Sequence, residues 1–174
     1  MKVLASIFTN IVLMLFGTRV TPQGEFIPQS SVVAAATFHG LSFVHGNEYT
    51  LEKKENSITI YIDPGAADLT IARHDIRGFS KEQIAEYHSL ADTVFLGDCL
   101  AMYKQECDDV IAGRAAFGKG CVIFLDGYPF YHVMLTFNTD SSLYKITYMC
   151  SMFSENASAS HEAFVRILNS ITID

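Results

Sequence analysis

The spacing of apolar and polar residues predicts a chain built mostly of β-strands. Residues 57–63 alternate strictly, with Ile58, Ile60 and Ile62 on one side and Ser57, Thr59 and Tyr61 on the other. A period of two residues with one apolar side indicates a strand that covers a core with one face. Further short strands are predicted at residues 41–44, 49–53 and 69–71.

A helix is predicted over residues 81–94. Ser80 and Gln83 have the spacing of a capping box, in which each side chain binds a backbone N–H group of the other residue. Residues suited to a buried helical face then recur three or four positions apart, at Ile84, Tyr87, His88 and Ala91. Beyond this helix, strands are expected at residues 99–103, 110–117 and 121–125, with turns at Asp108-Asp109 and Gly118-Lys119-Gly120.

The last part of the sequence predicts a hairpin followed by a helix. Asp126-Gly127 is a tight-turn dipeptide, and two β-rich runs, 130–138 and 143–152, flank a polar turn at 140–142. Apolar residues at helical spacing then continue to Ile171. We expect an antiparallel ribbon whose apolar side is covered by the terminal helix. The fold class is therefore α+β, with an antiparallel sheet sandwiched by helices.

The first residues resemble a leader. Lys2 is followed by a mostly apolar run that reaches Phe16 and ends in a polar break, which is typical of a secretory signal peptide and short for a membrane span. We expect residues 1–20 to be a signal peptide or anchor, 21–31 a linker, and 32–174 a single domain. This predicts a secreted, periplasmic or envelope-associated protein that meets a membrane only through an uncleaved leader. The alternative is a cytoplasmic protein whose first helix packs on the domain.

Composition narrows the possible functions. A chain of 174 residues that is 49% hydrophobic can bury a sizeable core. Its formal net charge of −7, without a Lys/Arg cluster, argues against nucleic-acid binding, which depends on a basic face. Its four cysteines form no C-x-x-C pair, so the sequence predicts neither a zinc knuckle nor a thioredoxin-type motif. They are Cys99, Cys107, Cys121 and Cys150.

The residues that could carry chemistry do not form a recognisable constellation. His132, in a predicted strand, could activate Cys121 or Cys150 as a nucleophile, but no family signature flanks either cysteine. The histidines lack the close pairing of a metal site in sequence. We therefore expect no catalytic residues, no metal and no cofactor. The histidines are His39, His45, His74, His88, His132 and His161.

Aromatic residues run through the predicted hairpin, and most of them should belong to the core. Tyrosines on the opposite side of the strands could instead form a contact surface, because Tyr offers a large contact area with little side-chain entropy to lose. Tyr131, Tyr144 and Tyr148 are the candidates for this partner surface.

Three segments carry a resemblance to a known superfamily. They are Gly127-Tyr128-Pro129-Phe130-Tyr131, Tyr144-Lys145-Ile146-Thr147-Tyr148 and Phe164-Val165-Arg166-Ile167-Leu168-Asn169-Ser170-Ile171. Together with the order of elements over about residues 38–174, they resemble the PsbP, Mog1 and DcrB-like proteins. The resemblance implies an α+β sandwich that acts as an accessory domain through protein contacts.

The sequence thus favours a non-enzymatic binding domain with a protein partner. Two alternatives stay open. One is a small thiol hydrolase that uses a Cys/His pair, and the other is a Mog1-like partner of a small GTPase.

Overall fold

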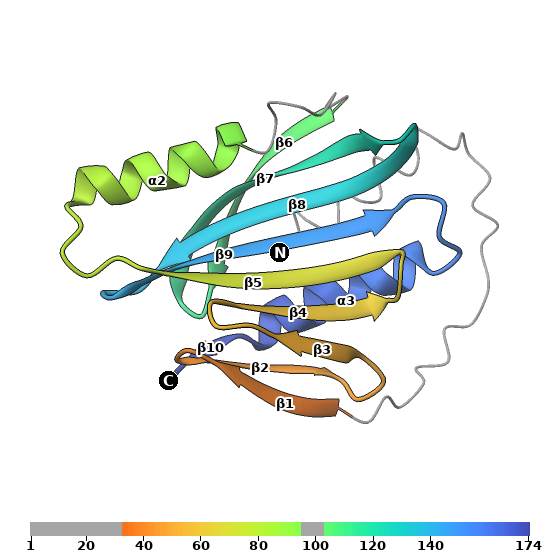
Figure 1. The fold of residues 1–174 in the computed structure, drawn as a ribbon, viewed down its shortest axis with the longest axis horizontal. Helices are drawn as coiled ribbons and strands as arrows, with labels where there is room; N and C mark the ends of the chain where they lie inside the picture. Colours follow the sequence, from red (N-terminus) through yellow and green to blue (C-terminus); the bar gives the residue numbers. More distant parts are fainter. Residues whose placement is uncertain (1–32, 95–102) are drawn as a thin grey trace.

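The computed structural model describes residues 33–94 and 103–174, which form two antiparallel sheets and two helices (Figure 1). The seven strands of the large sheet are, in spatial order, β3 (Thr50–Lys53), β4 (Ser57–Asp63), β5 (Ala67–Asp75), β9 (Ser142–Ser151), β8 (Tyr128–Asn138), β7 (Arg114–Leu125) and β6 (Tyr103–Ile111). The small sheet consists of β1 (Val33–Phe38), β2 (Leu41–Gly46) and β10 (Thr172–Ile173). The helices are α2 (Lys81–Val94) and α3 (Ala157–Ser170).

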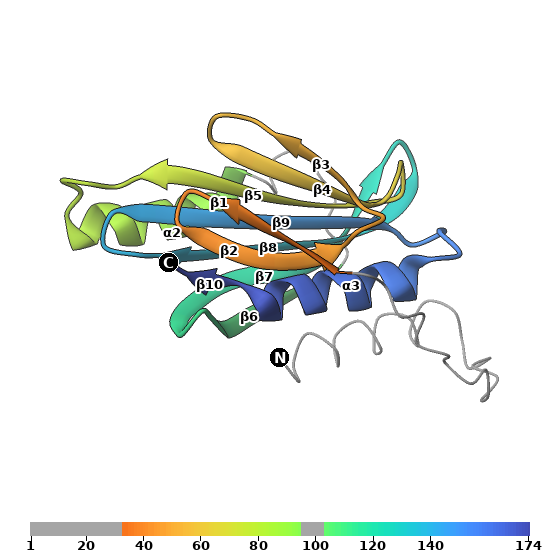
Figure 2. The ribbon, with the colours of Figure 1, turned by 90° about the horizontal axis from the view of Figure 1, so that it is seen from below.

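The core lies between the large sheet and α3. Figure 2 shows α3 running along one side of the sheet, with β1 and β2 beside it. The helix directs Phe164, Ile167 and Leu168 into the core, since apolar residues three and four positions apart share one face of a helix. A hydrogen bond of 2.8 Å from the Val44 N–H group to the Ser170 hydroxyl joins β2 to the end of α3. The small sheet is thereby fixed to the same core.

The structure confirms the predicted α+β class and several of the predicted elements. The strand predicted at 57–63 is β4, and its Ile58 and Ile60 are fully buried. The capping box before α2 is present: the Ser80 N–H group donates to Gln83 Oε1 at 2.8 Å, and the Gln83 N–H group donates to Ser80 Oγ at 3.3 Å. The hairpin of β8 and β9 lies against α3, as expected of the terminal helix.

The prediction was wrong for the hairpin of β6 and β7. Neither Asp108-Asp109 nor Gly118-Lys119-Gly120 is a turn, because both lie within strands that pair continuously. The true turn is at Ala112 and Gly113, whose φ angles of 50° and 75° are typical of a tight hairpin turn. Residues 99–102 of the strand predicted before this hairpin lie outside the described residues.

The expected leader and linker, residues 1–20 and 21–31, also lie outside the described residues and stay predictions. Within the described ranges, neither helix has the length and apolar character needed to span a bilayer.

Candidate functional site

The three tyrosines predicted to form a partner surface lie inside the core. Tyr131, Tyr144 and Tyr148 are 1%, 2% and 0% exposed. All three point to the side of the sheet that α3 covers, and the Tyr148 ring stacks on Phe164 with centroids 4.3 Å apart. The prediction that these tyrosines form a partner surface was therefore wrong. Alternation along the strands showed which residues share a face of the sheet, but not that α3 would cover the face with the tyrosines.

The structure separates the two cysteines that were candidates for a thiol site. Cys121 lies directly opposite His132 in the pairing of β7 with β8, whereas Cys150 is opposite Tyr131 and therefore faces the other side of the sheet. Cys121 and His132 are only 4% and 2% exposed. Burial, with a smaller effect of Lys145, lowers the pKa of His132 to about 4, which makes it a weak base near neutral pH.

Cys150 is a poor candidate for a nucleophile, because burial raises the pKa of its thiol and disfavours the reactive thiolate. Cys99 and the side chain of Cys107 lie outside what the structure describes. The geometry therefore favours packing roles for Cys121, Cys150 and His132. Among the described residues, no three His, Cys, Asp or Glu side chains are grouped closely enough to hold a metal ion.

The low pKa of His132 predicts a loss of stability in mild acid. In the unfolded chain this imidazole should titrate near 6.5, so between about pH 6.5 and pH 4 the unfolded state binds more protons than the folded state. The free energy of unfolding should therefore fall with decreasing pH, by about 1 kcal/mol per pH unit from this group. The measurement is urea denaturation of the native chain and His132→Gln between pH 8 and pH 4.5.

The variant should show a shallower pH dependence than the native chain in that window. At pH 8 the imidazole is neutral in both states, so any difference there reflects the other interactions of the side chain and serves as the control. An equal pH dependence of the free energy of unfolding in the two proteins would contradict the low pKa of His132.

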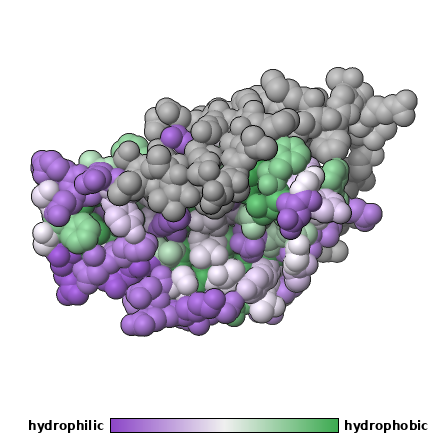
Figure 3. All heavy atoms as spheres, turned by 45° about the horizontal axis from the view of Figure 1, so that its top comes forward, coloured by the Kyte–Doolittle hydropathy of each residue, from purple (hydrophilic) through white to green (hydrophobic). Residues whose placement is uncertain are grey.

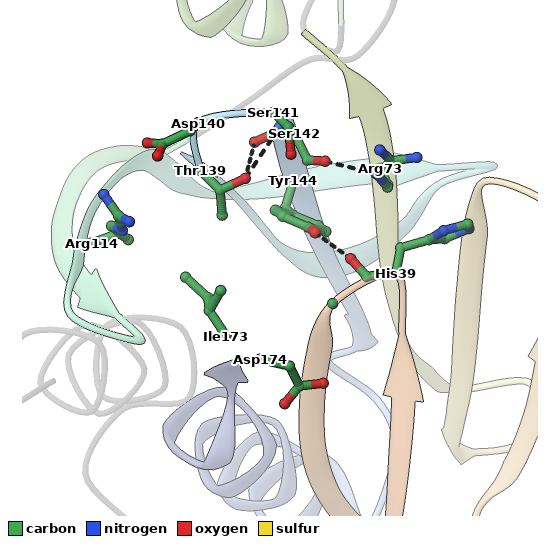
Figure 4. A pocket seen from close by; sticks show the side chains of 11 residues that line it. His39, Arg73, Arg114, Thr139, Asp140, Ser141, Ser142, Tyr144, Ile173 and Asp174 are labelled. Carbon is green, nitrogen blue, oxygen red and sulfur yellow. Dashed lines mark hydrogen bonds between the residues drawn. The ribbon is translucent and has the colours of Figure 1, made fainter. Parts of the chain in front are cut away.

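An open polar cleft lies where the turns at one end of the two sheets meet, and its volume is about 410 Å³. Figure 4 shows its lining converging from β5, β9, the start of β7, the β1–β2 and β8–β9 turns, and the chain after α3. The lining residues are His39, Gly40, Arg73, Arg114, Thr139, Asp140, Ser141, Ser142, Tyr144, Ile173 and Asp174.

Hydrogen bonds fix the base of this cleft. The buried Tyr144 hydroxyl donates to the His39 carbonyl at 2.5 Å, which ties the β1–β2 turn to the large sheet. In the β8–β9 turn, the Thr139 and Ser142 backbones are joined by an N–H···O bond of 2.8 Å. The Ser141 carbonyl accepts from the Ile76 N–H group at 3.0 Å. The backbone that frames the cleft is therefore held by groups from several elements.

The charged groups in and beside the cleft differ in how closely they are paired. Asp75, just outside it, is bound by the Arg77 guanidinium and backbone N–H group, and these bonds lower the Asp75 pKa to about 2. Arg73 lies farther from the same carboxylate, at 4.0 Å. It instead donates from Nε to the Ser142 hydroxyl at 2.8 Å. Arg114 is exposed at the start of β7.

A pair of exposed aromatic rings marks the opposite end of β8 and β9. Tyr128 and Phe153 meet edge to face, with ring centroids 6.4 Å apart.

Elsewhere the surface is mixed in character. Figure 3 shows extensive hydrophilic areas broken by smaller hydrophobic patches among the residues coloured in that view.

No family model matches the sequence, and no curated protein matches it. Solved structures are similar in fold. The solution structure of the cyanobacterial PsbP protein from Synechocystis aligns with a TM-score of 0.55 at 10% identity, over 89% of this chain and 99% of that chain. The chain has the PsbP-like fold.

Two further structures align less closely. LpqN of Mycobacterium tuberculosis, a protein involved in cell envelope biogenesis, gives a TM-score of 0.45 at 9% identity, over 88% of this chain and 89% of that one. A protein from Bacteroides thetaiotaomicron gives 0.48 at 10% identity, over 78% of this chain; the match spans 45% of that protein's length. The alignment with the Synechocystis structure confirms the predicted resemblance to the PsbP, Mog1 and DcrB-like proteins at the level of the fold.

Proposed function

We propose that this chain is a non-enzymatic accessory domain, exported or associated with the cell envelope, that binds a protein partner at the polar cleft. The cleft is the observation that carries the proposal. It is open, its lining combines two arginines, two aspartates and several hydroxyls, and its backbone is fixed by hydrogen bonds. A preformed polar surface of this kind loses little entropy when a partner docks.

The polar lining favours a segment of protein over a small apolar ligand. Small-molecule sites are mostly apolar and place only a few polar groups. In this cleft Ile173 is the aliphatic side chain, beside Tyr144 at the base. Backbone and charged groups of a peptide could bind such a lining. Export is supported by the leader-like pattern of residues 1–20.

Site-specific photo-crosslinking in the native host tests the proposal. A photo-crosslinking amino acid replaces Ser141, an exposed cleft residue, or, as the matched control, Glu155, an exposed residue beyond the opposite end of β9. Illuminated cells are then fractionated into envelope and cytoplasm. We expect one discrete adduct from position 141, in the exported or envelope fraction, and no such adduct from position 155.

The same adduct from both positions, or none from position 141, would show that the cleft is not the contact surface. An adduct found in the cytoplasm would contradict the proposed location.

A further inference from the structure

We propose that the cleft binds a carboxylate of an acidic peptide segment between Arg73 and Arg114. This inference rests on the proposed function, because it names the chemistry of the partner segment. The two arginines come from different elements, β5 and the start of β7. Figure 4 shows them on opposite sides of the cleft, with the β8–β9 turn between them.

Arg73 is held in orientation and forms only a long ion pair, with Asp75. Its Nε group donates to the Ser142 hydroxyl at 2.8 Å, which fixes the plane of the guanidinium. The nearest carboxylate, Asp75, is 4.0 Å from its Nη2 atom and is already hydrogen-bonded by Arg77. A guanidinium has five N–H donors, and the bond to Ser142 uses one of them. With 21% of its side chain exposed, Arg73 keeps donors that a ligand in the cleft can reach.

Arg114 supplies the second positive charge. It follows the tight turn at Ala112 and Gly113, whose left-handed backbone fixes where β7 begins. Its side chain is exposed, and it forms no ion pair with another residue of the described ranges. A carboxylate entering between the two arginines would therefore meet one guanidinium fixed in orientation and one free to adjust. Charge-assisted hydrogen bonds of this kind are stronger than neutral ones.

The acidic residues of the cleft limit what it can accept. The Asp174 carboxylate accepts from the Ser42 hydroxyl, at 2.8 Å to Oδ1 and 2.9 Å to Oδ2, while Asp140 is exposed at the tip of the β8–β9 turn. These two charges formally balance the two arginines and would repel a polyanion. A single carboxylate carried by a peptide suits this balance better than a phosphate ester, which carries more charge.

An NMR titration of the full-length protein tests the inference. The probe is a blocked peptide of sequence Gly-Gly-Glu-Gly-Gly, with the glutamine counterpart Gly-Gly-Gln-Gly-Gly as its control and inorganic phosphate as a third ligand. We expect the glutamate peptide to shift the backbone amide signals of the cleft, including Gly40 and Ser141, and the glutamine peptide to leave them unchanged. Phosphate should shift the same signals but bind more weakly than the glutamate peptide.

Matched arginine variants test whether the positive charges that bind the peptide are those of the cleft. Arg73→Gln and Arg114→Gln should each weaken binding of the glutamate peptide about tenfold, since each removes charge-assisted hydrogen bonds. Arg166→Gln removes the same charge from α3, outside the cleft, and should leave the affinity unchanged. Arg114 is exposed, so its variant should keep the native spectrum elsewhere even if loss of the Ser142 bond makes Arg73→Gln unfold.

Equal shifts from both peptides, or equal affinity of Arg114→Gln and the native chain, would overturn the carboxylate site. So would tighter binding of phosphate than of the glutamate peptide. The crosslinking experiment separates this failure from failure of the proposed function. An adduct at position 141 with no glutamate-specific binding would remove the carboxylate site and leave the protein contact standing. Glutamate-specific binding with no adduct at position 141 would leave the carboxylate site standing and remove the protein contact in the cell.

Discussion

Replacing Gly118 by alanine should lower the free energy of unfolding by about 3 kcal/mol or more. A Cβ atom at this position would lie 1.9 Å from the Met134 carbonyl oxygen and 2.9 Å from the Leu135 Cα atom. Both are backbone atoms of the neighbouring strand β8, so no side-chain rotation can relieve the overlap. The strands would have to move apart, with loss of hydrogen bonds between them. Urea denaturation of Gly118→Ala measures the effect.

Gly113→Ala is the matched control, in the turn that joins β6 to β7. Gly113 has a φ of 75°, but no heavy atom lies within 4 Å of a Cβ built there. Its replacement should therefore cost only the strain of a left-handed backbone, about 1–2 kcal/mol. Equal losses for the two variants would contradict the close contact of β7 and β8.

Phe164→Ala should destabilise the domain by about 3–5 kcal/mol, the range seen when large aromatic residues are removed from protein cores. Phe164 is fully buried, and its ring stacks on Tyr148 with an interplanar angle of 6°. Alanine would leave a cavity between α3 and the large sheet. The measurement is the midpoint and slope of urea denaturation, read from circular dichroism.

Glu162→Ala serves as the control, because Glu162 lies on the exposed face of the same helix. It should change the free energy of unfolding by less than about 0.5 kcal/mol. A loss of under about 1 kcal/mol in Phe164→Ala would mean that α3 does not dock as described.

The sequence predicted the elements whose signals are local. Alternation identified β4, because one side of that strand meets the core while the other does not. The capping box placed the start of α2 correctly, since both of its hydrogen bonds join residues three positions apart. The face of α3 was also correct, because Phe164, Ile167 and Leu168 have helical spacing.

The errors arose where one local signal has two meanings. Gly118 looked like a turn residue, but glycine is there because β8 approaches too closely for a side chain. The tyrosines show the same limit: whether Tyr131 and Tyr148 face solvent depends on where α3 packs, not on the strand pattern. The cleft could not be predicted, because Arg73, Arg114 and Asp174 are distant in sequence and meet only through the folding of both sheets.

The length of β8 sets a distance between two parts of the surface. Its 11 residues run from Tyr128, one of the two exposed rings, to Asn138, immediately before the turn that lines the cleft. At roughly 3.3 Å per residue this strand is on the order of 35 Å long. A molecule held in the cleft would thus leave the two exposed rings accessible. A second molecule bound at these rings would lie at a fixed distance from the first, because the strand between the two positions is rigid.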